Sequence, residues 1–209
     1  MVVKLFIFGS DGRRRYVTDL HDAARNKCLD QVPGNLLTVE NLMRLDSNGK
    51  TPLHYAAMHG CLHQVPKVVL FDETLIVKDA SEGDTVIHEA VYSDHLAQIP
   101  AELLTVENMS IQNNCGSTPI HYAAGYGYLS KVPKSVLTVE TLLIKDSVGN
   151  SPLSVARARQ HLDQVPLGLD FPDSVKGIVG EEWWEKNQAV LREKVGLTAA
   201  EEGADVDLF

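Results

Sequence analysis

Apolar and polar positions follow one another along the chain in a pattern that repeats about every 33 residues. The clearest copies are TPLHYAAMHG at residues 51–60 and TPIHYAAGYG at residues 118–127, two apolar stretches rich in strong helix formers. Thr51 suits a helix N-cap, and Pro52 suits the first helical position, where its missing N–H costs nothing. Gly60 suits the stop, because glycine can take the left-handed cap conformation. The pattern predicts one short helix per copy.

Three markers keep the same phase through most of the chain. A position marked by histidine recurs at intervals of 33, 34, 33 and 33 residues: His21, His54, His88, His121 and then Ser154. Eleven residues after each stands a β-branched residue followed by proline, at 32–33, 65–66, 99–100, 132–133 and 165–166. Nineteen residues after each of the first four stands a glutamate, namely Glu40, Glu73, Glu107 and Glu140. The phase indicates five structural units.

The second half of each unit is interrupted by its proline. The residue before a proline is displaced from helical angles, so a continuous helix cannot pass through residues 32–33. A new start signal follows in LTVENL at residues 37–42, where Thr38 suits an N-cap and Glu40 lies in the first turn. We therefore expect two short helical pieces in this half.

These markers resemble the ankyrin repeat family, whose unit of about 33 residues carries a T-P-L-H-x-A signature. The resemblance covers residues 18–166, and the V-P and L-T-x-E-N-L style looks like that of bacterial and phage proteins. It implies an all-α repeat solenoid: an ankyrin-like stack of five helical repeats with short β-hairpin fingers, an N-terminal hairpin and a C-terminal helix. The expected divisions are a hairpin cap over 1–17, the array over 18–170, and a helix with an acidic tail over 171–209.

Charge and cysteine content narrow the class further. The chain of 209 residues has a net charge of −9, of which residues 171–209 carry −5, and this argues against direct binding of nucleic acid. No apolar run has the length needed to span a bilayer. Cys28, Cys61 and Cys115 are an odd number without a paired motif, which favours a reducing compartment and hence a cytoplasmic protein.

The residues that invite a chemical interpretation have structural explanations. Successive repeat histidines should lie on rungs about 8–10 Å apart, too far for one metal ion, and the resemblance implies a structural role for them. The glutamate column is explained by the helix dipole, although an acidic binding strip remains an alternative. No catalytic motif is present, so we expect no catalytic residues, no metal and no cofactor.

Contact residues follow from the resemblance, since ankyrin proteins bind through finger tips and the concave helix face. Carried over to this chain, the partner-binding positions are Arg25, Asn48, Lys50, Met58, His59, Glu82, Tyr92, Ser93, Asn114, Tyr126 and Arg159. A predicted helix at 181–196 has two interpretations: the favoured one is that it caps the last repeat, and the other is that Trp183 and Trp184 form a possible second surface for a partner.

The sequence thus predicts a non-catalytic protein–protein interaction module, an adaptor or stoichiometric regulator that binds another protein. The alternative is an acidic inhibitor, similar to an antitoxin, that blocks a nucleic-acid-handling protein through the charge of its tail.

Overall fold

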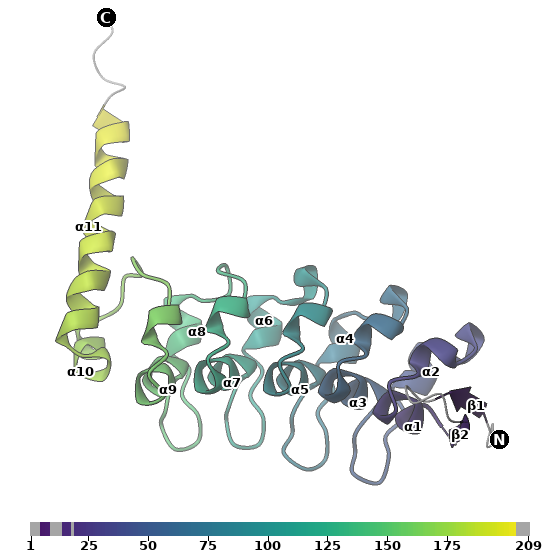
Figure 1. Ribbon diagram of the computed structural model, residues 1–209. Helices are drawn as coiled ribbons and strands as arrows, with labels where there is room; N and C mark the ends of the chain where they lie inside the picture. The colour runs from purple at the N-terminus through teal and green to yellow at the C-terminus, as the bar shows by residue number, and fades with distance from the viewer. Residues whose placement is uncertain (1–4, 9–13, 18, 204–209) are drawn as a thin grey trace, which may run out of the picture.

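Five helical units stack side by side into an elongated array, and a long helix stands across its C-terminal end (Figure 1). The computed structural model describes the backbone of residues 5–8, 14–17 and 19–203, and the side chains of residues 19–194. Residues 1–4, 9–13, 18 and 204–209, the last range being the end of the acidic tail, lie outside the described residues. The predicted fold class, an all-α solenoid of stacked helical repeats, is confirmed.

Each unit begins with one short α-helix that packs on the same helix of the neighbouring units. Thr51, Thr85 and Thr118 act as N-caps, with the hydroxyl oxygen accepting from the backbone N–H three residues on. Proline occupies the first turn of the second, fourth and fifth of these helices, as predicted. Their bounds are α1 (Leu20–Arg25), α3 (Pro52–His59), α5 (Val86–Tyr92), α7 (Pro119–Tyr126) and α9 (Pro152–Ala158).

Left-handed residues end these helices. Gly60 and Gly127 have φ values of 71° and 74°, as their positions predict. Lys27, Asp94 and Gln160 take the same place in the other three units with φ of 56°, 62° and 64°. A side chain is disfavoured in this region by roughly 1–2 kcal/mol, so three of the five turns hold a strained residue.

The second half of each of the first three units consists of two 3-10 turns and a one-turn α-helix. The predicted interruption at the proline is confirmed. The prediction of two pieces is wrong for these three units, because each side of the proline forms its own 3-10 turn, and it holds in the fourth unit. Thr38 caps the last piece as predicted, accepting from Asn41 N–H. The bounds are η1 (Leu29–Gln31), η2 (Gly34–Leu36) and α2 (Val39–Leu42), η3 (Leu62–Gln64), η4 (Lys67–Val69) and α4 (Asp72–Leu75), and η5 (Leu96–Gln98), η6 (Ala101–Leu103) and α6 (Val106–Met109).

The fourth and fifth units shorten this scheme, with η7 (Leu129–Lys131) and α8 (Val139–Leu143) in the fourth and η8 (Leu162–Gln164) in the fifth. Leucines at equivalent positions of these second halves are buried in the core and form rows that run along the array. One row holds fully buried Leu29, Leu62 and Leu129 with nearly buried Leu96. Burying one such side chain contributes about 2 kcal/mol, and the row continues from the first unit to the fourth.

The fingers between units are tight turns. Asp46 organises the first one, because its carboxylate accepts from the N–H groups of Asn48 and Lys50, at 2.9 and 3.0 Å. Within residues 19–203 the fingers form no strands, and their ladder is reduced to one bridge between Lys78 and Thr85. The expected β-hairpin fingers therefore have the shape of hairpins without the strands.

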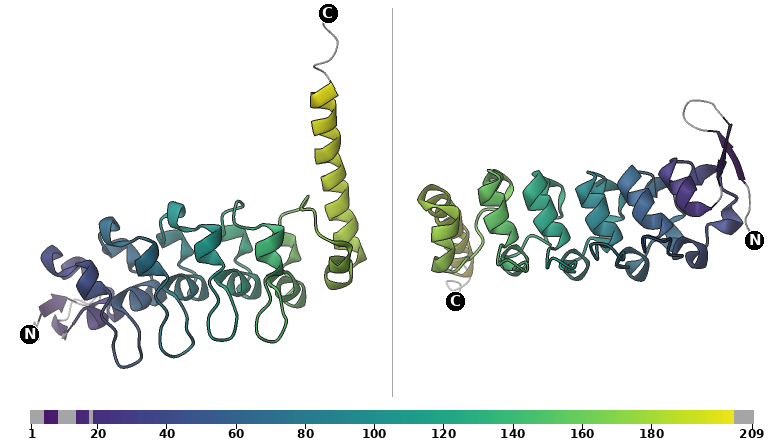
Figure 2. Two further views of the ribbon diagram at one scale, coloured as in Figure 1. Left: turned by 180° about the vertical axis from the view of Figure 1, so that it is seen from behind. Right: turned by 90° about the horizontal axis from the view of Figure 1, so that it is seen from below.

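The N-terminal residues pair as two antiparallel strands, β1 (Leu5–Phe8) and β2 (Arg14–Val17). They lie beside α1 at the end of the array opposite the long helix (Figure 2). At the other end follow η9 (Asp173–Val175), α10 (Lys176–Val179) and α11 (Glu181–Gly203). The division of the chain at residues 17/18 and 170/171 stays a prediction.

The strained turn after α9 gives a direct test of the capping geometry. We expect Gln160→Gly to stabilise the protein by about 0.5–1 kcal/mol, because glycine removes the left-handed penalty but loses some entropy on folding. Ala158→Gly, two residues earlier in the helix, should instead destabilise it by about 0.5–1 kcal/mol. Urea unfolding of both variants measures the difference, and two changes of the same sign would contradict the assignment.

Candidate protein-binding surface

A histidine in each of the three central units holds the finger of the next unit in place. The backbone N–H of Thr51 donates to Nδ1 of His54 at 3.1 Å, so this nitrogen is an acceptor. The proton therefore sits on Nε2, which donates to the carbonyl of Asp84 at 3.1 Å, 30 residues on. His88 and His121 repeat both contacts, reaching the carbonyls of Ser117 and Asn150.

Burial keeps these imidazoles neutral. It lowers the pKa of His54 to about 4 and also lowers the pKa of His88 and of His121. His21 differs in its partner, since its Nε2 contacts the carbonyl of Arg44 at 2.9 Å. The predicted structural role of the histidines is thus supported by the bonds of each ring.

Lys50, a predicted contact residue at a finger tip, is engaged inside the array. Its Nζ pairs with the carboxylates of Asp79 in the next finger and Glu89 on α5. The Asp79 carboxylate is fully buried and also accepts from the N–H groups of Glu82, Gly83 and Asp84. Lys50 therefore serves as the link between the second unit and the third.

Opposing effects set the ionisation of this trio. Burial acts to lower the pKa of Lys50, but its bonds to Asp79 and Glu89 outweigh burial and raise it. Burial acts to raise the pKa of Asp79, yet Lys50 and the backbone donors hold it below its usual value. For Glu89 burial prevails, and its pKa is raised although Lys50 is adjacent. Asp79 is the carboxylate that the finger stabilises in its charged form.

Arg25 is also held by its own chain. Its guanidinium lies 4.0 Å from the centre of the Tyr55 ring and donates to Asp46 at 2.8 Å. The Tyr55 hydroxyl donates to the same Asp46 carboxylate at 2.8 Å. Arg25 thus covers the interface between the first two units.

Tyr92 and Tyr126, predicted as anchors, come together on adjacent helices. Their ring centres are 5.3 Å apart at 87°, and the side chains are 54% and 49% exposed. Tyr122 joins both, at 6.3 and 6.5 Å, and Tyr128 stacks on Tyr126 at 6.2 Å. These four residues, the tyrosine cluster, form an aromatic surface where the third and fourth units meet.

Sequence reasoning missed Tyr122 and Tyr128. Tyr122 follows the repeat histidine directly and so falls inside the repeat signature, but its ring contacts those of Tyr92 and Tyr126 while its hydroxyl donates to Asp84. Tyr128 follows the stop Gly127, which brings its ring back over α7. The signal that could have found them is the density of the motif, with three tyrosines within seven residues at 122–128.

The other predicted contact residues divide by exposure. Asn48, Glu82, Asn114 and Arg159 are exposed, and His59 and Ser93 are half-buried. Met58 packs partly against the core. Neighbouring tips also touch, because Asn114 N–H donates to the carbonyl of Glu82 at 2.8 Å. The finger row is therefore a continuous rim, and it presents polar groups beside the tyrosine cluster.

Trp183 and Trp184 contact the chain itself. Trp184 is 6% exposed and belongs to the same hydrophobic core as the repeats. The indole N–H of Trp183 donates to the carbonyl of Leu162 at 3.1 Å, and its ring lies 6.0 Å from that of Phe171. Asn187 ties the helix to the preceding loop through Gly168 and Leu169. These contacts support the capping alternative for the helix over a second partner surface.

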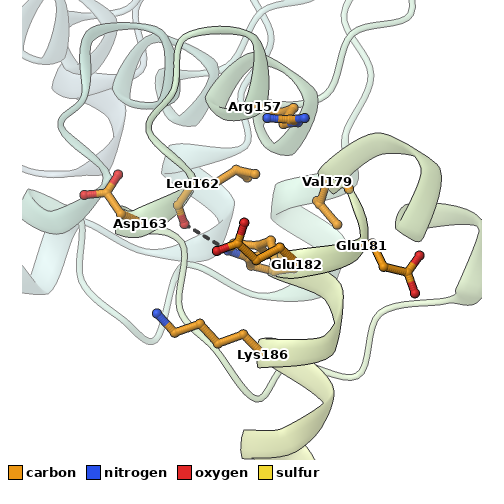
Figure 3. A pocket seen from close by; sticks show the side chains of 9 residues that line it. Arg157, Leu162, Asp163, Val179, Glu181, Glu182 and Lys186 are labelled. Atoms are coloured by element: carbon orange, nitrogen blue, oxygen red, sulfur yellow. Dashed lines mark hydrogen bonds between the residues drawn. The ribbon is translucent and has the colours of Figure 1, made fainter.

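A shallow cavity of about 370 Å³ remains at this junction (Figure 3). Arg157 reaches it from α9, Val179 from α10, and Glu182 and Lys186 from α11. The dashed line in Figure 3 marks the bond to the carbonyl of Leu162 that anchors the first turn of α11. The walls of the cavity carry side chains of both charges, and Trp183 already donates to Leu162 there, so the cavity is best explained as a gap between packed elements.

Residues 20–101 match the family model described as ankyrin repeats (3 copies). Residues 20–101 are thus ankyrin repeats, and the two units after residue 101 keep the same capped helix, with His121 in the fourth unit and Ser154 at the histidine position of the fifth. No curated protein sequence matches the chain significantly. Ankyrin repeats form a protein-binding class of domain that is typically non-catalytic, so the family agrees with an interaction surface.

Metal binding and membrane crossing can both be tested against the described residues. Among residues 19–194, no three histidine, cysteine, aspartate or glutamate side chains gather where they could hold a metal ion. The helices that the structure describes include none with both the length and the apolar character that a bilayer crossing needs. Residues 204–209, on which the acidic-blocker alternative partly depends, lie outside the described residues.

The neutral histidines make stability depend on pH. Their folded-state pKa values lie below the unfolded value of about 6.5, so stability is fully present above pH 6.5 and is lost as pH falls toward the folded values. We expect a slope of up to about 1.4 kcal/mol per pH unit for each histidine, ending near pH 4 for His54.

Urea unfolding between pH 7.5 and pH 4 measures this slope. His54→Gln should be less stable at pH 7 but should lose less stability on acidification. His63→Gln, at an exposed position, should keep the slope of the parent protein. An unchanged slope in His54→Gln would contradict the neutral-histidine assignment.

The Lys50 link predicts a large cost for losing one cation. Lys50→Met leaves the buried Asp79 and Glu89 without their partner, and we expect a loss of about 3 kcal/mol. Lys67→Met, at an exposed site, should change stability by less than about 0.5 kcal/mol. Equal unfolding midpoints for the two variants would contradict the stabilising role of Lys50.

Proposed function

We propose that this chain is a cytoplasmic adaptor or stoichiometric regulator that acts without catalysis, by holding a partner protein against its finger tips and concave helix face. The observation that carries the proposal is the tyrosine cluster, with Tyr92 and Tyr126 half exposed at the centre of the array. Large aromatic side chains that remain exposed in contact with one another are the usual anchors of protein interfaces.

The rest of the surface suits a rim around that anchor. Asn48, Glu82 and Asn114 line the row of finger tips, and exposed Arg159 follows the last residue of α9. Specific interfaces bury about 800 Å² per partner, drawn from some 20–30 residues. A stack of five units offers that area without any rearrangement, since every finger is already bound to its neighbour through a histidine or the Lys50 link.

The cysteines support the cytoplasmic part of the proposal. Cys28 and Cys61 are buried thiols that donate to the carbonyls of Ala23 and Ala24, and Cys115 is an exposed thiol. Burial raises the pKa of Cys61 to about 12, so this thiol is unreactive as well as unpaired. An exposed free thiol is typical of proteins that work in a reducing compartment.

Affinity capture from the native cells tests the proposal. The full chain should retain a stoichiometric protein partner, and the double variant Tyr92→Ala, Tyr126→Ala should lose it, with binding weakened at least 30-fold, or about 2 kcal/mol. Val68→Ala, which trims another exposed side chain on η4, is the control and should bind fully.

Thermal unfolding accompanies the capture. Because both tyrosines are exposed, we expect their loss to change the free energy of unfolding by no more than about 1 kcal/mol. Full binding by the folded double variant would show that the concave face is not the contact surface.

A further inference from the structure

Equivalent positions in two repeat interfaces carry different residues. Arg25 and Tyr92 each stand four residues after the repeat histidine, and Tyr55 and Tyr122 each stand one residue after it. Between the first two units, the Arg25 guanidinium covers the Tyr55 ring and pairs with Asp46. Between the third and fourth, a tyrosine replaces that arginine, so this interface lacks the corresponding cation.

Carboxylates nevertheless remain beneath the tyrosine cluster. Asp84 accepts from the Tyr122 hydroxyl at 3.1 Å and from the Asn113 amide at 2.7 Å. Glu89 and Asp79 lie buried nearby, and the single amine among them is that of Lys50. Three carboxyl groups face one ammonium group there in a region of low dielectric, which favours a further cation on the Tyr92 and Tyr122 side of the cluster. Lys131 and Arg159 lie on the Tyr128 and Tyr126 side.

Two tyrosine rings in the array, one of them in the cluster, already have a cation over them. Arg25 lies over Tyr55, and Lys131 lies 4.5 Å from the centre of the Tyr128 ring while it pairs with Asp94. In the part of the chain that the structure describes, no lysine or arginine lies over Tyr92 or Tyr126. Within the cluster, Tyr128 is the ring that carries a cation among the described residues, and the two most exposed rings, Tyr92 and Tyr126, are uncovered.

We propose that the Tyr92–Tyr126 pair receives an arginine side chain from an extended segment of the partner protein. This inference rests on the proposed function and names the chemistry of the partner. A guanidinium is planar and weakly hydrated, so it stacks on a phenol ring, as Arg25 does on Tyr55, and its N–H groups can donate to hydroxyl oxygens. Arg159 lies near Tyr126 and repels a cation there, so the arginine enters from the side of Tyr92.

Peptide titration of the full chain tests the inference, with NMR signals of the tyrosine rings as the readout. Three peptides, acetyl-GSGXGSG-amide with X as arginine, glutamate or proline, differ in the central residue alone. We expect the arginine peptide to bind with a millimolar dissociation constant, at least fivefold more tightly than the other two. Its binding should weaken with added salt.

Two matched variants separate ring stacking from simple apolar contact. Tyr92→Phe, Tyr126→Phe keeps both aromatic faces and should bind the arginine peptide within about threefold of the parent. Tyr92→Leu, Tyr126→Leu keeps apolar area without aromatic faces and should bind about tenfold more weakly. Arg159→Gln should bind more tightly than the parent, because it removes the nearby repulsion.

Three results would overturn the arginine proposal: tighter binding of the glutamate or proline peptide, unchanged binding by the leucine variant, or no ring shifts at about 10 mM peptide. The proposed function is judged separately by the captured partner. A partner that needs Tyr92 and Tyr126 but is not displaced by the arginine peptide would refute the arginine alone. A partner retained by the alanine double variant would refute the surface itself.

Discussion

The bond from a buried imidazole to the carbonyl of the next finger is the interaction on which the array depends. It closes a polar backbone group that would otherwise be buried unpaired, and it does so between residues about 30 positions apart. The same ring completes the cap of its own helix, so helix start and finger position are set together. Proton binding by the ring would remove an acceptor from one side of this arrangement.

This constraint decides which residues remain for binding. Backbone and charged groups at the fingers are largely used within the stack, as the bonds of Asp46, Asp79 and Lys50 show. Tyr92 and Tyr126 are the last residues of α5 and α7, and their side chains are about half exposed and lie outside the buried core. The surface proposed for the partner is therefore the part of each unit that the fold leaves unused.

Much of the fold could be predicted from the sequence because its signals are local. Thr51, Pro52 and Gly60 act within one helix, and their roles depend on backbone geometry that any neighbour would accept. The pairing of Lys50 with Glu89 could not be predicted from the sequence, since it joins residues 39 positions apart across an irregular finger with one inserted residue. A capping role for α11 could be expected from the sequence, but which tryptophan is buried could not, because it depends on how the loop before α11 folds back. Tyr122 shows the same limit within the site: its position was evident, but its contact with Tyr92 depends on the stacking of two helices.

The strained ends of three helices show at which turns a residue with a side chain can replace glycine. Gly60 and Gly127 lie against the imidazoles of His95 and His161, so a β-carbon at either place would collide with a ring of the following unit. Lys27, Asp94 and Gln160 show that the same backbone tolerates side chains in the alternate turns. Histidine on one rung thus demands glycine on the rung before it, and an exchange at either place requires a compensating exchange at the other. At these positions, substitutions in neighbouring units would have to occur together, Gly60 with His95 and Gly127 with His161.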